Sequence, residues 1–154
     1  MKIQNQQLEI KAQNEIIAFS AYNKGGNFYE SDFLTFTNFH SQIGNGLDLK
    51  SGIFTAPIPG FYSFSFHGQY HFDFDVTAVE ILHNGSRVAM IDAFKHSDDH
   101  GFSGYLSYSW MLDLKQNDQV RLRVFSGEIY VYPFHYMVFN GQLIGSLSAI
   151  QRSK

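Results

Sequence analysis

The sequence predicts an all-β fold, because its apolar residues recur with the period of strands. Apolar and polar side chains alternate through residues 62–76, as in a strand with one buried face. The same period of two recurs in residues 106–114 and 120–124. After Ile16 no segment sustains the 3.6-residue period of a helix, and Gly, Pro, Asn and Asp separate the runs. Nine or ten short strands of this kind indicate a sandwich or jelly roll.

The run at residues 62–76 is expected to be one strand that buries an aromatic row. That row is Tyr62, Phe64, Phe66, Tyr70, Phe72, Phe74 and Val76, and the opposite row includes Ser63, Ser65, His67, Gln69, His71, Asp73 and Asp75. The polar row has two interpretations. It is a plain solvated sheet face, or it lines a subunit contact or ligand groove whose imidazoles titrate near about pH 6.5.

Two hairpins are predicted between the later strands. Asn84-Gly85 suits a type I′ turn joining residues 79–82 to residues 88–91. Asn84-Gly85-Ser86 is also a glycosylation sequon, but we favour the turn. The polar residues 115–118 are short enough to connect residues 106–114 and 120–124 as a second antiparallel hairpin. Shorter β-like runs are residues 17–22, 34–39, 53–56 and 136–144.

Composition indicates one globular domain and excludes several partners. The 154 residues are 44% hydrophobic and 17% aromatic but only 16% charged, which favours burial of some surface against another subunit over a monomer with an unusually aromatic core. A net charge of −3 gives no field that would attract nucleic acid or an anionic membrane. No apolar stretch approaches the roughly 20 residues of a membrane span, so no membrane insertion is expected.

No enzyme motif is present, and the chain is expected not to be an enzyme. It contains no Cys, which removes thiol catalysis, disulfides and thiolate metal sites. Gly101-Phe102-Ser103-Gly104 lacks the spacing of a nucleophile elbow, and there is no phosphate loop or His-Glu-x-x-His motif.

Residues 36–44 and 47–66 resemble the signature of the C1q globular-head family. The specific part is Gly-Ile-Phe-Thr-Ala-Pro-Ile-Pro-Gly-Phe-Tyr-Ser-Phe at residues 52–64. Residues 17–21, 112–120 and 139–143 extend the resemblance, which covers roughly residues 16–146. A bend between strands is expected at Gly52, Pro57, Pro59 and Gly60. The glycines reach unusual backbone angles, and the prolines have no N–H to donate to a β-ladder hydrogen bond.

The resemblance implies a ten-stranded jelly roll, related to the tumour necrosis factor superfamily, that assembles as a homotrimer through aromatic faces. Phe64, Tyr108 and Trp110 are the expected interface residues. No collagen-like Gly-x-y stalk is present, so the chain is similar to the stand-alone, secreted type found among invertebrate immune lectins. A signal peptide is absent from the chain as given.

The flanking segments are expected to lie outside this domain. Residues 1–15 form a tail or a short neck helix, since Ile3, Ile10 and Ile17 have heptad spacing but polar residues occupy the intervening positions. Residues 147–154 are expected to be a C-terminal tail.

A cation site is one interpretation of the polar segment at residues 92–100. Carboxylates suit calcium, whereas imidazoles favour zinc or another transition metal. The resemblance implies calcium bound by two acids, of which Asp92 is the first and Asp99 the second, although an ungapped alignment places His100 there. The expected metal ligands are Asp92, Asp98, Asp99 and His100. The alternative is a solvated loop that keeps the domain soluble.

The expected ligand-binding residues are His96 in that segment and Tyr130, Tyr132 and His135 in the aromatic run around Pro133. Aromatic planes support the apolar faces of sugar rings, although packing against a neighbouring subunit explains the same run.

Three functions follow from the resemblance. The first is a pattern-recognition lectin of innate immunity that binds microbial glycans or other repetitive surfaces, with calcium as an optional cofactor. The second is a cytokine-like or adipokine-like trimer that binds a protein receptor. The third, a calcium-binding extracellular matrix protein, is less attractive at a net charge of −3.

Overall fold

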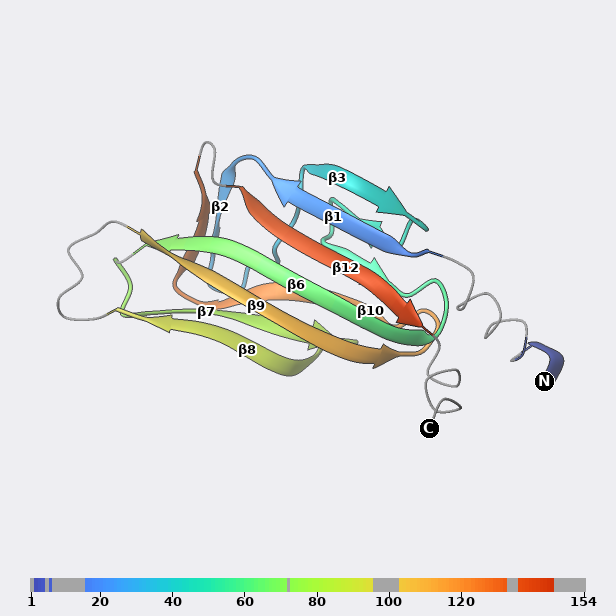
Figure 1. The fold of residues 1–154 in the computed structure, drawn as a ribbon. Coiled ribbons are helices and arrows are strands. Elements are labelled where there is room, and N and C mark those ends of the chain that lie inside the picture. The colour runs from blue at the N-terminus through green and yellow to red at the C-terminus, as the bar shows by residue number, and fades with distance from the viewer. Residues whose placement is uncertain are drawn as a thin grey trace.

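Two antiparallel β-sheets pack face to face as a jelly-roll sandwich, which confirms the predicted fold class (Figure 1). The computed structural model describes residues 2–4, 6, 16–71, 73–95, 103–132 and 136–145. Residues 2–4 and 6 are helical. The strands in the described part are β1 (Ala18–Asn23), β2 (Gly26–Tyr29), β3 (Asn38–Ile43), β4 (Leu47–Asp48), β5 (Ile53–Thr55), β6 (Gly60–His71), β7 (Val76–His83), β8 (Ser86–Phe94), β9 (Ser103–Leu114), β10 (Gln119–Ser126), β11 (Glu128–Val131) and β12 (Met137–Gly145).

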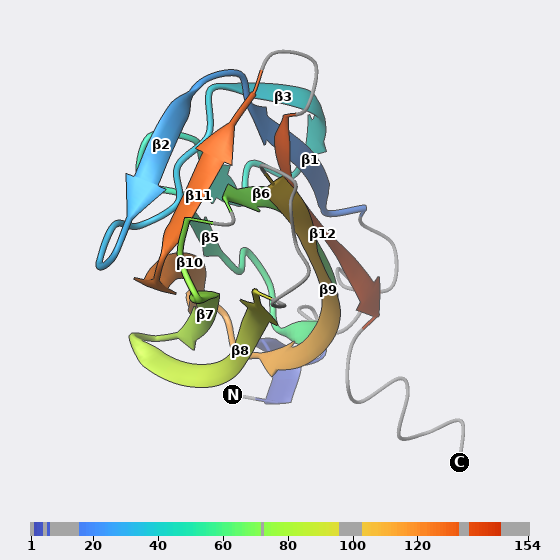
Figure 2. The same ribbon diagram turned by 90° about the vertical axis from the view of Figure 1, so that its left-hand side faces the viewer.

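The first sheet is built around β6. It has the order β2-β11-β6-β12-β1-β3, with β9 on the other side of β6 along the full length of that strand. The second sheet has the order β4-β5-β10-β7-β8. Viewed end-on, the two sheets form separate layers, and β8 and β9 approach each other at one edge of the sandwich (Figure 2). Within the described residues, no helix is long and apolar enough to span a membrane.

The core between the sheets is largely aromatic. Phe54 in the second sheet contacts Phe64 and Tyr62 of β6, with ring centroids 5.5 and 5.3 Å apart. Phe139 of β12 lies 6.0 Å from Phe64 and 5.0 Å from Phe19. The Tyr62 hydroxyl donates a 2.6 Å hydrogen bond to the Ile58 carbonyl, so the buried phenol is satisfied. Burial raises the pKa of Tyr62 to about 12, despite the opposing effect of that hydrogen bond.

Residues 62–76 are not one strand, and this prediction was wrong. The first part is β6, which buries Tyr62, Phe64 and Phe66 as expected. The chain then turns and crosses to the second sheet, where β7 begins at Val76. Phe74 lies in this turn with 38% of its surface exposed. Apolar and polar residues still alternate in the turn, although the strand has ended. The periodicity of the sequence therefore did not reveal the end of β6.

The predicted β9–β10 hairpin is also wrong, because these strands belong to different sheets. β9 pairs with β6, whereas β10 pairs with β5 and β7, so residues 115–118 connect the two layers. The other hairpin is confirmed: β7 pairs with β8, and Asn84 and Gly85 have φ values of 50° and 84°. In residues 34–39 the strand begins only at Asn38, and sequence periodicity missed the short strands β2, β4 and β11.

Gly52 and Gly85 provide a matched test of the turns. Both have positive φ values, of 72° and 84°. A Cβ added at Gly52 would lie 2.0 Å from the Leu34 carbonyl oxygen, whereas one added at Gly85 would meet nothing within 4 Å.

We predict that Gly52→Ala lowers the free energy of unfolding by about 2–5 kcal/mol, because a backbone clash adds to the cost of a left-handed alanine. Gly85→Ala should cost only about 1–2 kcal/mol, the conformational term alone. Urea denaturation monitored by circular dichroism measures both values. Equal losses would show that the contact between Gly52 and Leu34 does not constrain the fold.

Candidate functional site

The described residues that flank the predicted cation and ligand segments lie at one end of the sandwich. In Figure 1 the ends of β6 and β8 and the start of β9 lie at the end away from the start of β1, and β11 pairs with the last residues of β6. Asp92 is exposed on β8, three residues before Lys95, the last described residue of that segment. Asp98, Asp99, His100 and His96 lie outside the described residues. Among the residues that are described, no three His, Asp or Glu side chains are grouped to hold a metal ion.

The aromatic run divides into a packed ring and an exposed ring. Tyr130 is buried on β11, and its ring stacks on His71 of β6 with centroids 3.7 Å apart and planes 7° apart. Tyr130 therefore supports the end of the sheet and does not offer its ring to a ligand, contrary to expectation. Tyr132 contacts the Tyr130 ring edge-on at 5.5 Å and remains 54% exposed. His135 lies outside the described residues.

The three expected interface residues have different environments. Phe64 is buried in the core, where it faces inward because it alternates with Ser63 and Ser65 along β6. The prediction that Phe64 lies at a subunit interface was therefore wrong. Trp110 stacks on Phe64 at 5.6 Å and is only partly covered, while Tyr108 is 42% exposed. All three point to the interior face, but β9 is an edge strand, which leaves Tyr108 and Trp110 at an open margin. Within the described part of the protein, the buried Trp110 Nε1 has no hydrogen-bond partner.

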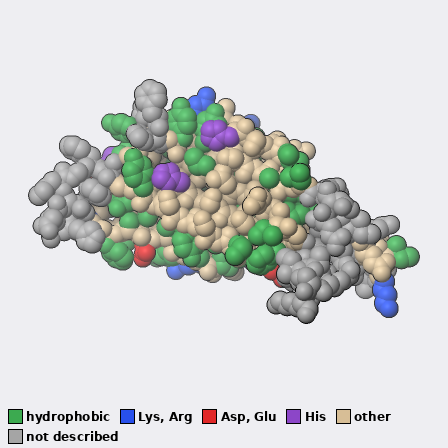
Figure 3. All heavy atoms as spheres, in the orientation of Figure 1, with side chains coloured by type: hydrophobic (Ala, Val, Ile, Leu, Met, Phe, Trp, Pro, Cys, Tyr) green, Lys and Arg blue, Asp and Glu red, His purple; other side chains and the backbone are tan. Residues whose placement is uncertain are grey.

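The outer face of the first sheet contains a hollow of about 310 Å³ with an uncharged lining. Its polar side chains are Ser20, Ser41, Ser63, Ser65, Asn140 and Gln142, and Asn140 Nδ2 donates to Ser65 Oγ at 3.1 Å. Lys, Arg, Asp and Glu lie only at the margins of the described part of this face (Figure 3). Beside the hollow, His67 stacks on Tyr105 at 5.3 Å and its Nδ1 lies 2.7 Å from Ser107 Oγ. In the polar row of β6, Ser63, Ser65 and His67 therefore form part of an accessible surface, whereas Gln69 is buried.

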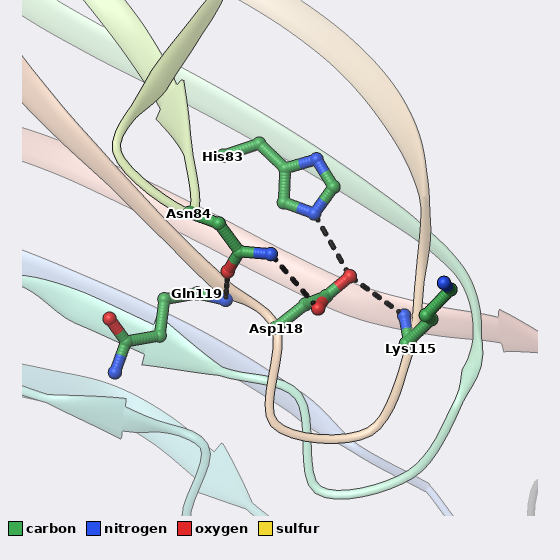
Figure 4. A network of polar contacts seen from close by, with 5 residues as sticks. All are labelled: His83, Asn84, Lys115, Asp118 and Gln119. Atoms are coloured by element: carbon green, nitrogen blue, oxygen red, sulfur yellow. Dashed lines mark hydrogen bonds and ion pairs between the residues drawn. The ribbon is translucent and has the colours of Figure 1, made fainter.

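A network of polar contacts at the other end of the sandwich was not foreseen from the sequence (Figure 4). Asp118 Oδ1 accepts a 3.0 Å hydrogen bond from Asn84 Nδ2. Asp118 Oδ2 accepts a 2.9 Å bond from the Lys115 backbone N–H and lies 2.9 Å from His83 Nε2. The Gln119 N–H donates to Asn84 Oδ1 at 2.8 Å. These contacts join the β7–β8 turn to the β9–β10 connection, and no catalytic nucleophile takes part.

This network explains the role of Asn84 and shifts the pKa of Asp118. Both atoms of the Asn84 amide are engaged, so a glycan on Nδ2 would disrupt the contact with Asp118, in agreement with the turn interpretation. Burial alone would raise the pKa of Asp118, but hydrogen bonds from Asn84, His83 and the Lys115 N–H outweigh it and lower the pKa to about 2. The only sequence signal was a short polar cluster beside an Asn-Gly turn.

Comparisons with known proteins agree with one another. The family model described as C1q domain matches residues 18–144. Complement C1q tumor necrosis factor-related protein 3 of Mus musculus is 30% identical over 111 residues, which are 72% of this chain and 44% of that protein. Caprin-2 of Danio rerio is 30% identical over 131 residues, 83% of this chain but 14% of that protein. The chain thus spans less than half the length of these two relatives.

Solved structures share the fold. The globular domain of zebrafish complement 1qA protein superposes with a TM-score of 0.67 and 23% identity, covering 84% of this chain and 98% of that one. Eiger TNF from S. frugiperda gives a TM-score of 0.67 at 12% identity, covering 85% of this chain and 94% of that one.

We predict that Asp118→Asn lowers the free energy of unfolding by about 1–3 kcal/mol at pH 7, because the amide cannot accept all the hydrogen bonds made by the carboxylate. The pKa of Asp118 is depressed in the folded state, so its stabilisation is complete above the unfolded pKa of about 4 and is lost as the pH falls through about 2. The stability difference between wild type and variant should therefore shrink as the pH falls from about 4 toward about 2. Urea titrations across this range measure it, and a pH-independent difference would contradict the account.

Proposed function

This chain belongs to the C1q domain family, and from that premise we propose that it is a non-enzymatic, secreted recognition module that acts as a homotrimer. The observation that carries this proposal is the open margin between β8 and β9. Tyr108, Met111 and Val88 are exposed there, and Trp110 packs against the core but is not fully buried. Exposed apolar groups that gather at one edge mark an interaction site on a soluble protein.

The hollow on the first sheet is a suitable partner for this margin. It is lined by small, uncharged side chains, so an aromatic edge can enter it without leaving a charge unpaired. Contact between the margin of one copy and the hollow of the next joins two different surfaces. Such head-to-tail contacts form a closed ring when the rotation between copies is suitable, and three copies complete the proposed ring.

The ligand of the trimer is proposed to be a repeated surface glycan, bound at the end of the sandwich where Tyr132 is exposed. An exposed tyrosine ring supports the apolar face of a sugar, and its hydroxyl bonds to sugar hydroxyls. Tyr132 directly follows β11, and Asp92 lies two residues before the end of β8. A trimer would present three equal sites, which raises avidity for a repetitive surface.

Calcium is proposed as an aid to this site. Asp92 offers an exposed carboxylate, and the other expected ligands, Asp98, Asp99 and His100, lie outside the described residues. A bound calcium ion would supply further positions for hydroxyl oxygens of a ligand. A single described carboxylate is a partial fit to a site that needs six to eight oxygens.

A protein receptor is the second candidate, and one observation favours it. Phe94 at the end of β8 is 58% exposed, close in the sequence to Asp92 and at the same end as Tyr132. Large exposed apolar side chains are typical of the centre of a protein interface.

We predict that the wild-type chain sediments as a trimer and that Tyr108→Asp sediments as a monomer, because a buried unpaired carboxylate at the margin opposes association. Tyr29→Asp is the matched control, since Tyr29 is 50% exposed on β2, away from this margin. It should remain trimeric. Sedimentation velocity with circular dichroism separates assembly from unfolding. A monomeric wild type at micromolar concentration would refute the assembly.

We predict that the trimer binds microbial glycans on an array and that Tyr132→Ala weakens this binding by about tenfold, the effect of losing one aromatic stacking contact. Tyr29→Ala should bind as wild type. Removing calcium with a chelator should weaken binding if the cation takes part. Absence of any glycan binding, together with saturable binding to host-cell membrane protein, would replace the lectin proposal with the receptor proposal.

A further inference from the structure

A second cavity lies on the outer face of the other sheet. It has a volume of about 240 Å³ and is lined by Glu30, Ser31, Glu80, Arg87, Arg123 and Phe125, with Val124. Glu80 alternates with the core residues Val79 and Ile81, and Arg123 with Leu122 and Val124, so both side chains point away from the core. The proposed subunit contacts use the first sheet and the margin between β8 and β9, where Val88 lies, whereas the cavity opens on the outer face of the second sheet.

A buried carboxylate fixes two guanidinium groups in the cavity. Glu80 is 1% exposed, and it pairs with Arg87 Nη2 at 3.2 Å and with both Nε and Nη2 of Arg123. A charge so deeply buried requires such pairing. Arg87 and Arg123 remain 46% and 37% exposed. Each guanidinium has five N–H groups, so N–H groups remain that Glu80 does not engage.

The charged groups that line the cavity are Arg87 and Arg123 and, opposite in charge, the buried Glu80 and the exposed Glu30. Arg121 lies on the same face, its guanidinium 3.4 Å from the centroid of Phe33, and Arg123 lies 5.5 Å from the same ring. Burial, and secondarily the charge of Arg123, lower the pKa of Arg121. Asp32 does not line the cavity, and its Oδ2 accepts a 2.8 Å hydrogen bond from the Tyr29 N–H.

The rim of the cavity adds neutral, apolar and accepting groups. Ser31 has a φ of 74° and is held by a 2.8 Å bond from its N–H to the Val124 carbonyl. Phe125 presents an exposed ring, with the Arg87 guanidinium 4.6 Å from its centroid. Glu30 is exposed and can accept hydrogen bonds from hydroxyl groups.

We propose that this cavity binds a single sugar ring that carries a carboxylate, that is, a uronic acid residue of an acidic glycan. Arg87 and Arg123 bind the planar carboxylate, for which the guanidinium fork has matching geometry. Ser31 and Glu30 bind ring hydroxyls, and Phe125 contacts the apolar face of the ring. The volume lies below the about 300 Å³ at which pockets for drug-sized ligands begin, which suits one ring. This inference deepens the proposed glycan function and rests on it.

The test is calorimetric titration of the full chain with methyl β-glucuronide, methyl β-glucoside and sodium sulfate. Wild type should bind the glucuronide saturably, with one site per chain, and bind the neutral glucoside at least about tenfold more weakly, since one charge-assisted hydrogen bond contributes that much. Arg87→Gln should lose about tenfold in affinity for the glucuronide, and Arg87→Lys, which keeps the charge but not the fork, should fall between the two. Lys24→Gln removes an equal charge from an exposed loop and should leave affinity unchanged.

Three outcomes would overturn the assignment: equal affinity for glucuronide and glucoside, no effect of Arg87→Gln in a protein that melts normally, or sulfate binding as tight as glucuronide binding. The Arg87→Lys variant keeps the test valid if Arg87→Gln fails to fold. If Arg87→Gln still binds the glycan array and shows no preference for acidic sugars, the cavity is not the binding site and the proposed function stands. An array with no bound glycan, alongside saturable glucuronide binding at Arg87, would reject the proposed function and retain the cavity.

Discussion

The aromatic contact between the two sheets determines how the rest of the molecule is arranged. Phe64 of β6 packs edge-on against Phe54 of the opposite sheet and stacks on Phe139 and Trp110 within its own sheet. Because directly opposed residues of antiparallel strands share a face, fixing Phe64 inward also fixes the orientation of β9 and β12. Among the described strands only β6 pairs with β9, so the aromatic layer reaches an open margin at Trp110 and Tyr108.

The same alternation gives the two outer faces different chemistry. On the first sheet it exposes serines and amides around a hollow without charged lining residues. On the second it exposes arginines around the buried Glu80. An uncharged face beside an aromatic margin suits contact between copies, whereas a charged face suits a polar ligand. Self-association and ligand binding can therefore use separate surfaces, with Tyr132 at a third position on the end of the sandwich.

Local patterns in the sequence predicted those features that depend on local physics. Alternation identified the inward face of β6 and the strand β9, and Asn84-Gly85 identified a turn that needs positive φ. The errors concern features that depend on the second sheet. The turn at Phe74 continues the alternation, and the β9–β10 connection is as short as a hairpin although it joins two layers. Phe64 was placed at a subunit interface because residue type does not distinguish an aromatic side chain that faces the core from one that faces a partner subunit. The contact between His83 and Asp118 and the contact between Glu80 and Arg123 join residues 35 and 43 positions apart in the chain, which no local pattern reveals.

Trp110 is the only tryptophan in the chain, so its fluorescence reports directly on the margin between β8 and β9. Our central claim is that this margin is covered by another copy of the chain. Acrylamide quenching of the unmodified protein, measured over a dilution series from tens of micromolar to low nanomolar, tests it without any mutation. The account predicts weak quenching at high concentration and a rise on dilution as copies separate. Strong quenching that does not change with concentration would show that the margin is never covered.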